Sequence, residues 1–428
     1  SYKALVIKKT DKSTVENFVT TADLESAVAT ATNEKVSLRT IPFDYHWEND
    51  KEIAFTYQGE NNKYFILYNV ETKKVSKNIK FAASSAEEII APNKNYIVYL
   101  NKNNIEIVFN NGEVVKVTND PDHVINGSSN THRNEFGINR GMWISPDNKK
   151  ILFYKKDERM VKDYPLVDFG TRIAEEKPIK YPMAGMKSEE VSLHIYNIDT
   201  KTTTPLTIEG DKEQFLTMPT WSPNSESVYV GVLNRGQDYL KLQRYTAATG
   251  KLDKQLFEEK SKTYVEPNTP LKFLNDKEFI YISEKEGYRQ MYRYNTSGKQ
   301  LNSYVYKDVL FKGFVDVSPK EIYYMGTANK GMDKLLYKVD LKSGKTIPVT
   351  KTSATYSVEM NKDKTWYYSQ YTNFTTPNNV SLNTVNGKST IELLNAPNPY
   401  EGKTVLPKVE MVSIKAADGK TNLNGRIL

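Results

Sequence analysis

A turn-and-strand pattern recurs along this chain of 428 residues and limits the folds that it can adopt. The clearest copies open with an anchor of the Ser-Pro-Asn type, weaker copies open with an anchor that ends in Asp, and a strand rich in Tyr, Val and Ile follows each anchor. Proline fixes φ in such a turn and Asp or Asn accepts backbone hydrogen bonds, so the turn is specified locally. The anchors are residues 47–50, 90–93, 144–147, 221–224, 273–276, 317–320 and 360–363, and the strands after them are residues 53–57, 96–100, 151–154, 228–232, 279–282, 322–324 and 366–368.

The spacing of these copies indicates a β-propeller. Copies about 45 to 55 residues apart match the four-stranded blade of that fold. A second strand with a turn that ends in Gly-Lys also recurs, as at residues 291–299 and 336–345. We therefore predict an all-β fold, a seven- or eight-bladed β-propeller of four-stranded antiparallel blades over residues 1–410. Residues 1–40 and 389–410 would supply the closing blade.

The composition favours strands and excludes several kinds of site. The chain has 29 Tyr and 16 Phe, and aromatic residues are enriched in strands. It has no cysteine, which excludes disulfides, thiolate metal ligands and a thiol nucleophile. The four histidines are too separated to predict a metal site, and no cofactor-binding motif occurs. The net charge is +7, but basic residues are scattered between acidic ones, so we expect no nucleic-acid partner.

One interval between anchors is longer than the others. The interval from Pro146 to Pro223 is about 25 to 30 residues longer than a blade needs, and the surplus lies around residues 155–190, which we expect to leave the blade as an extended hairpin or loop. Long insertions in compact folds are usually functional. Tyr164 and Asp168 in this insertion are therefore candidates for lining a binding cavity, although Tyr-Pro segments also serve as ordinary packing elements.

The end of the chain predicts a hairpin. Residues 411–428 read as two strands around a turn at Asp418 and Gly419. A hairpin alone is marginal in water, so we expect these residues to begin a second domain that this chain lacks. No Gly-x-Ser-x-Gly nucleophile elbow, His-Glu-x-x-His motif or P-loop occurs in the sequence. We therefore predict that the chain holds no catalytic residue and is inactive alone.

Residues 131–185 point to a particular family. Residues 134–138 read Asn-Glu-Phe-Gly-Ile, residues 142–147 read Met-Trp-Ile-Ser-Pro-Asp, and residues 181–185 read Tyr-Pro-Met-Ala-Gly. In order and spacing these motifs resemble the N-terminal propeller of the dipeptidyl peptidase IV and prolyl tripeptidyl peptidase family. The likeness covers essentially the whole chain, and the terminal hairpin is similar to the first hairpin of that family's α/β-hydrolase domain.

The resemblance implies a site for the amino terminus of a peptide. In the family, two adjacent glutamates on a short helical insertion bind the free α-amino group of the substrate. Glu135 matches the second glutamate, whereas Asn134 stands at the position of the first. Arg133 could substitute for the family's substrate-carbonyl arginine, and His132 lies beside the site. The other adjacent glutamate pairs are read as solvated turns or edges, at residues 87–88, 175–176, 189–190 and 258–259.

A single carboxylate holds an ammonium group less tightly than two carboxylates do. In this respect the segment resembles relatives that release tripeptides ending in proline. The resemblance thus implies the substrate-recognition and gating propeller of a proline-specific serine exopeptidase that releases N-terminal di- or tripeptides. Its partners would be a peptide with a free amino terminus, its own α/β-hydrolase domain and, at full length, a second copy in a homodimer.

The expected location is the bacterial periplasm, the cell envelope or the extracellular space. The alternative is a free-standing propeller that binds proteins or glycans. The terminal hairpin distinguishes the two, because a self-contained propeller has no need of it.

Overall fold

The computed structural model describes residues 4–8, 15–82, 85–132, 134–306, 308–405, 407 and 409–427. Strands hold 50% of the residues and helices 4%, which confirms the all-β class. The chain forms two compact units, Ser1–Leu271 and Lys272–Leu428.

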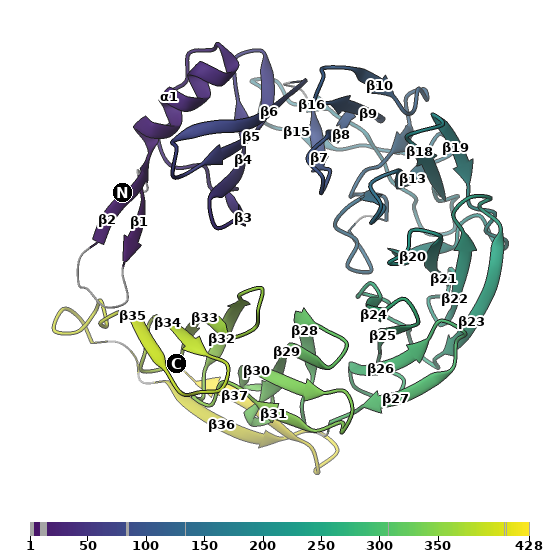
Figure 1. Ribbon diagram of the computed structural model, residues 1–428. Helices are drawn as coiled ribbons and strands as arrows, with labels where there is room; N and C mark the ends of the chain where they lie inside the picture. The colour runs from purple at the N-terminus through teal and green to yellow at the C-terminus, as the bar shows by residue number, and fades with distance from the viewer. Residues whose placement is uncertain are drawn as a thin grey trace. The chain divides into compact units, whose positions relative to one another are not determined.

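The first unit is built from antiparallel sheets whose strands mostly follow one another in the sequence (Figure 1). In such sheets short turns join the paired strands and fix their register. The strands are β3 (His46–Asn49), β4 (Glu52–Gln58), β5 (Asn62–Asn69) and β6 (Lys74–Ala82) in the first sheet; β7 (Ala86–Ile90), β8 (Tyr96–Asn101), β9 (Asn104–Phe109) and β10 (Val114–Lys116) in the second; β11 (Val124–Asn126), β12 (Met142–Ile144), β13 (Lys150–Asp157), β18 (Glu190–Asn197) and β19 (Thr202–Pro205) in the third; and β20 (Phe215–Trp221), β21 (Ser227–Leu233), β22 (Tyr239–Thr246) and β23 (Leu252–Lys260) in the fourth.

Each of these sheets shares a hydrophobic cluster with the next one along the chain. The first and second sheets share the cluster of Phe65 and Ile97. The third and fourth sheets share the cluster of Leu152 and Val230, and all four side chains are fully buried. Burial of both faces explains why the central strands are continuous runs of Tyr, Val, Ile and Leu rather than alternating patterns.

The second unit repeats this plan. Its strands are β24 (Lys272–Asn275), β25 (Glu278–Ser283), β26 (Gln290–Asn295) and β27 (Gln300–Tyr304) in one sheet, and β28 (Phe311–Val317), β29 (Glu321–Ala328), β30 (Asp333–Asp340), β31 (Thr346–Pro348), β32 (Thr355–Met360), β33 (Trp366–Thr372), β34 (Asn379–Thr384) and β35 (Thr390–Asn395) in another, with the 3₁₀ turn η1 (Asn329–Gly331) after β29. The second of these sheets consists of two runs of four strands. Over the described residues the runs join only through the parallel pair of Lys334 with Thr355.

The strands predicted after the seven anchors are confirmed: they lie in β4, β8, β13, β21, β25, β29 and β33. Of the chain ends expected to supply a closing blade, residues 389–410 contain β35, which pairs with β34 as the last strand of the β32–β35 run. Near the amino end, β1 (Ala4–Lys8) pairs with β2 (Val15–Thr20), and the helix α1 (Thr21–Thr32) follows.

The helix α1 was not predicted. It begins with a capping box in which the Thr20 side chain accepts from the Asp23 N–H and the Asp23 carboxylate accepts from the Thr20 N–H. Only Leu24 and Val28 are fully buried, one turn apart, in the cluster that also holds Ile66. A stripe this narrow leaves little periodic signal in the sequence.

The insertion predicted at residues 155–190 does form an extended hairpin. The strands β14 (Asp163–Tyr164) and β17 (Ile179–Lys180) pair with each other, and β15 (Val167–Asp168) pairs with β16 (Glu175–Glu176). Between these pairs the Lys177 N–H donates to the Leu166 carbonyl over 2.7 Å, so the ladder is continuous. We call residues 163–180 the ribbon.

The terminal hairpin is also confirmed, as β36 (Glu410–Lys415) paired with β37 (Asn422–Ile427). Asp418 accepts hydrogen bonds from the N–H groups of Lys420 and Thr421, both over 2.8 Å, and Gly419 has φ 67°. An Asp that accepts these bonds and a Gly with positive φ are what such a turn requires. Within the described residues, no helix combines the length and the apolar character needed to span a membrane.

Candidate functional site

The candidate site is the loop between β11 and β12, residues 127–141, which we call the 127–141 loop. Strand β13 holds both of its ends: the Gly127 N–H donates to the Tyr154 carbonyl over 2.7 Å, and the Tyr154 N–H donates to the Gly141 carbonyl over 3.0 Å. A Cβ added to Gly141 would lie 2.3 Å from the carbonyl of Gly127. The glycines therefore let the two ends touch, and the loop is compact for this reason.

His132 anchors the middle of the loop to the core. Its ring is 5% exposed, and its Nε2 accepts a hydrogen bond from the Leu216 N–H over 3.2 Å. The rings of Tyr154 and Phe215 meet it edge-on, both with centroids at 5.6 Å. Burial lowers the pKa of His132 to about 4, because a charged imidazolium would lose its hydration there. An uncharged ring that accepts a backbone bond acts as a structural support.

After His132, residues with positive φ turn the 127–141 loop away from the core and back toward it. Asn134 has φ 64° and Phe136 has φ 55°, both in the left-handed region. The Phe136 ring returns to the core and lies 4.9 Å from the Phe215 ring, centroid to centroid. Ile138 is buried beyond it. Glu135 therefore lies at an outward turn between two anchored parts of the loop.

Glu135 and Asn134 are both exposed. The Glu135 N–H donates to the His132 carbonyl over 3.0 Å, while its carboxylate makes no hydrogen bond or ion pair with any described residue. Arg133, predicted as a substrate-binding residue, lies outside the described residues. The described part of this segment forms turns rather than the short helix that the resemblance implied.

Glu87 is a neighbour of the loop that was not predicted as a site residue. Its carboxylate accepts hydrogen bonds from the Ser129 N–H over 2.6 Å and from the Ser128 hydroxyl over 3.2 Å. Glu87 has φ 50°, a conformation that persists only where the surroundings impose it. The sequence predicted a solvated turn at residues 87–88, and nothing in it links that turn to a loop some forty positions later.

A hollow of about 470 Å³ lies between β7 and the two ends of the 127–141 loop. Glu87, Ile89 and Ile90 line it from β7, and Asn139 and Arg140 line it from the loop. The Arg140 guanidinium is exposed and has no hydrogen-bond or ionic partner in the described part of the chain. A carboxylate and a guanidinium around one hollow can bind the polar groups of a peptide backbone. Neither Asn134 nor Glu135 lines this hollow.

The remaining predicted residues lie on the ribbon. Tyr164 is 39% exposed, and its ring centroid lies 5.8 Å from that of Tyr181. Asp168 pairs with Lys177 and accepts from the Gly170 N–H over 2.8 Å, and the bond from Lys177 lowers the pKa of its carboxyl group. These contacts shape the ribbon itself. No hydrogen bond or ion pair between described residues links either side chain to the 127–141 loop.

No group of three or more His, Asp or Glu side chains comes close enough to hold a metal ion, as far as the described residues extend. The structure thus brings His132, Asn134 and Glu135 into one loop and adds Glu87 and Arg140. This arrangement can bind a cation or a peptide end.

Comparison with known proteins gives a family for this chain. The model of the dipeptidyl peptidase IV (DPP IV) N-terminal region matches residues 48–378. A probable dipeptidyl-aminopeptidase B of Pyrenophora tritici-repentis is 27% identical over an aligned length of 304, with 62% of this chain and 34% of that protein covered. A dipeptidyl peptidase 4 of Trichophyton rubrum is 24% identical over an aligned length of 442, with 93% of this chain and 56% of that protein covered.

Two crystal structures are similar over 99% of this chain. A protein of Bacteroides ovatus assigned as a dipeptidyl aminopeptidase IV gives a TM-score of 0.87 at 28% identity, with 62% of its chain covered. The Porphyromonas gingivalis dipeptidyl peptidase 4 gives a TM-score of 0.76 at 21% identity, with 61% of its chain covered, and supports the fold alone. The chain therefore spans about a third to three fifths of the length of these relatives.

Proposed function

Because this chain belongs to the dipeptidyl peptidase IV family, as its N-terminal region, we propose that it recognises the substrate of a proline-specific serine exopeptidase. The enzyme would release di- or tripeptides from the amino terminus of a peptide. The observation that carries the proposal is the carboxylate of Glu135. It is exposed and has no partner within the described residues, and the loop that bears it is fixed at both ends.

An unpaired carboxylate on a rigid support is suited to binding an ammonium group. Binding costs less when the acceptor does not have to break an existing bond or become ordered first. The two backbone hydrogen bonds between Tyr154 and the ends of the 127–141 loop, together with the buried ring of His132, keep the loop ordered before the substrate binds. We therefore propose that Glu135 binds the substrate's α-amino group directly and that His132 acts as a positioning residue. Arg140 would hold a substrate carbonyl from the neighbouring hollow, the role that the sequence suggested for Arg133.

Glu135→Gln in the full-length enzyme tests this role. The change removes one side of a charge-assisted bond worth about 1.5 to 3 kcal/mol, so kcat/KM for peptides with a free amino terminus should fall about ten- to a hundredfold. Peptides with an acetylated amino terminus should be poor substrates before and after. As a matched control, Glu71→Gln alters an exposed glutamate that pairs with Lys51 and should leave kcat/KM unchanged. Equal kcat/KM values for the wild type and Glu135→Gln would contradict the proposal.

The asparagine at position 134 bears on the length of the product. With one carboxylate instead of two, the amino terminus can be held farther from the nucleophile, and one more extended residue needs about 3.3 Å of reach. We therefore propose release of tripeptides in preference to dipeptides. Matched Xaa-Pro and Xaa-Xaa-Pro reporter substrates compare the two directly, and a higher kcat/KM for the Xaa-Pro reporter would refute the preference.

For the architecture we propose a β-propeller over residues 1–410. Seven sets of paired strands support it, six of four strands and one of five: β3–β6, β7–β10, β11–β13 with β18 and β19, β20–β23, β24–β27, β28–β31 and β32–β35, as described. Within each unit, sheets that follow one another share a hydrophobic cluster, as propeller blades must. Whether β1 and β2 add to an eighth blade, and whether residues 411–428 begin an α/β-hydrolase domain, can be read from an experimental structure of the full-length protein.

Membership of the family is also the basis for four further proposals, which concern gating, the catalytic triad, the cellular location and the oligomeric state. We propose that a hydrolase domain outside this sequence supplies Ser, Asp and His, and that the N-terminal region limits access to them. Turnover of a proline reporter by this chain alone, blocked by a serine-directed inhibitor, would refute this. We further propose a periplasmic or envelope protein that forms homodimers, to be checked by cell fractionation and by sedimentation of the full-length protein.

A further inference from the structure

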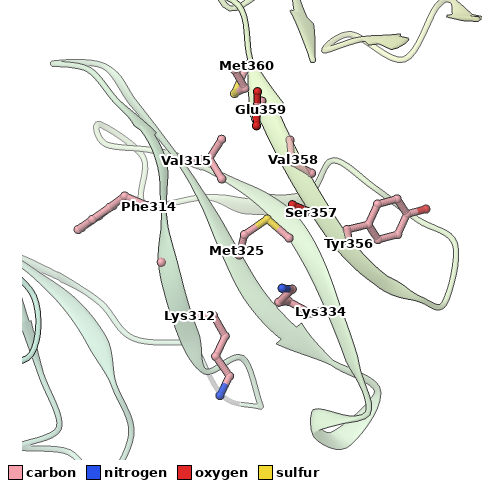
Figure 2. Close-up of a pocket in the computed structure, with 11 residues that line it drawn as sticks. Lys312, Phe314, Val315, Met325, Lys334, Tyr356, Ser357, Val358, Glu359 and Met360 are labelled. Atoms are coloured by element: carbon pink, nitrogen blue, oxygen red, sulfur yellow. The ribbon is translucent and has the colours of Figure 1, made fainter. Parts of the chain in front are cut away.

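A slot of about 480 Å³ lies in the second unit between strands β28 and β32 (Figure 2). It is remote in sequence from the 127–141 loop and uses none of its residues. Strand β28 contributes residues 312–315, strand β32 contributes residues 356–360, and Met325 and Lys334 of the intervening strands complete the lining.

Both bordering strands have backbone groups available for another strand. Among the described residues β28 pairs only with β29, and β32 meets β30 only where Thr355 pairs with Lys334. Beyond that pair, residues 356–360 of β32 are paired on one side, with β33. A strand edge without a partner can accept an extended peptide, whose main chain then supplies the affinity.

Gly313 in β28 indicates that the slot is kept open. A Cβ added to this residue would meet nothing within 4 Å, and the residue does not need a positive φ. Glycine inside a strand costs about 0.5 to 1 kcal/mol relative to alanine. It often marks a bulge or a place where another backbone approaches closely, and the register of β28 does shift beside Gly313.

The charges of the slot are separated along its length. Strands β28, β30 and β32 run parallel, and Figure 2 shows Lys312 and Lys334 at one end and Glu359 at the other. No ion pair or side-chain hydrogen bond engages these three side chains in the part of the chain that is described. Valine and methionine side chains line the middle, from Val315, Met325, Val358 and Met360.

We propose that this slot binds a short extended peptide with a free carboxyl terminus. The carboxylate would lie at Lys312 and Lys334, and apolar side chains would cover Val358 and Met325. A free amino group, where the peptide has one within reach, would lie toward Glu359. Three or four extended residues span about 10 to 13 Å, comparable with the stretches of four residues in β28 and five in β32 that line the slot. The inference goes beyond the proposed function, because neither Glu135 nor the 127–141 loop takes part.

Calorimetric titration of the 428-residue chain with the tripeptide Ala-Val-Leu tests the proposal. The free acid should bind, and its carboxamide should bind about tenfold more weakly, since the amide carries no charge for the lysines. Lys312→Gln combined with Lys334→Gln should weaken the free acid by the same factor, about 1.4 kcal/mol, and abolish the difference between acid and amide. Lys320→Gln, a control at an exposed turn of the same unit, should change nothing.

Gly313 gives a second, steric test. Gly313→Leu should fill the slot and abolish binding, whereas Gly313→Ala should keep most of it because the extra methyl group has open space. If Gly313→Leu does not fold, the Lys312→Gln and Lys334→Gln double variant still tests whether the slot binds the carboxylate. Equal binding of acid and amide would overturn the proposal. So would displacement of the tripeptide by laurate, which would indicate a lipid site. Loss of binding in Glu135→Gln would place the peptide at the 127–141 loop instead, and would overturn this inference while supporting the proposed function.

Discussion

Acid should loosen the 127–141 loop through a single side chain, His132. In the folded protein its ring is buried and its Nε2 is occupied by the Leu216 N–H. Its pKa is lowered to about 4 from an ordinary value of 6.5. The unfolded chain therefore binds a proton at His132 more readily than the folded chain does. The stability that the neutral ring contributes is complete above pH 6.5 and is lost as the pH falls toward 4.

The size of this effect follows from the two pKa values. Linkage between a pKa of 6.5 and one of about 4 lowers the free energy of unfolding by about 2 kcal/mol between pH 7.5 and pH 5. The fully developed difference at lower pH is about 3 kcal/mol. His194 has a pKa also lowered to about 4 by burial, so the wild type should lose a similar amount there. The contribution of His132 is therefore measured as the difference between the wild type and a His132 variant in the free energy of unfolding that is lost on acidification.

The assay is urea unfolding of the wild type and of His132→Gln at pH 7.5 and pH 5, followed by tryptophan fluorescence. Trp143 reports on this region, because its ring centroid lies 5.3 Å from that of Tyr154. His132→Gln should be less stable than the wild type at pH 7.5, yet it should lose about 2 kcal/mol less on acidification because glutamine does not titrate. Val228→Ala, the control, damages the hydrophobic cluster that also holds Tyr154 without removing a ring that meets His132, and it should keep the wild-type loss. Identical losses in the wild type and His132→Gln would show that His132 does not carry the acid sensitivity.

Three further variants test the support of the loop and of the ribbon. Gly141→Ala should destabilise the first unit by more than about 2 kcal/mol, since its Cβ would lie 2.3 Å from the backbone of Gly127; denaturant unfolding measures this, and wild-type stability would contradict the close crossing. Tyr154→Phe removes the buried bond of 2.5 Å from the Tyr154 hydroxyl to the Leu216 carbonyl and should cost about 1 to 2 kcal/mol in the same experiment. Asp168→Asn breaks only the exposed pair with Lys177, so Tm should not change, and a large drop would mean that the ribbon supports the core.

Much of the fold is encoded locally, and the sequence predicts that part well. A turn that contains Pro, Asn or Asp and the strand after it are determined by neighbouring residues, which is why all seven predicted strands are present. The extended hairpin at residues 163–180 follows from the same logic, because its length breaks the repeat. The helix α1 escaped prediction because only two of its side chains are fully buried. Its stability comes from packing against distant strands rather than from its own pattern.

The candidate site shows where local information ends. The sequence by itself determined that Glu135 follows Asn134 in a segment that resembles a motif of this family, and that no cysteine chemistry is available. Only the tertiary structure decided that His132 points into the core rather than toward a ligand, because Leu216 and Phe215 come from a strand about eighty residues away. The same holds for Glu87, whose carboxylate meets Ser129 only when separate sheets pack. The residues that determine a turn are neighbours in the chain, so the turn can be predicted from the sequence. Burial and hydrogen bonds between distant residues arise only when the sheets pack against one another.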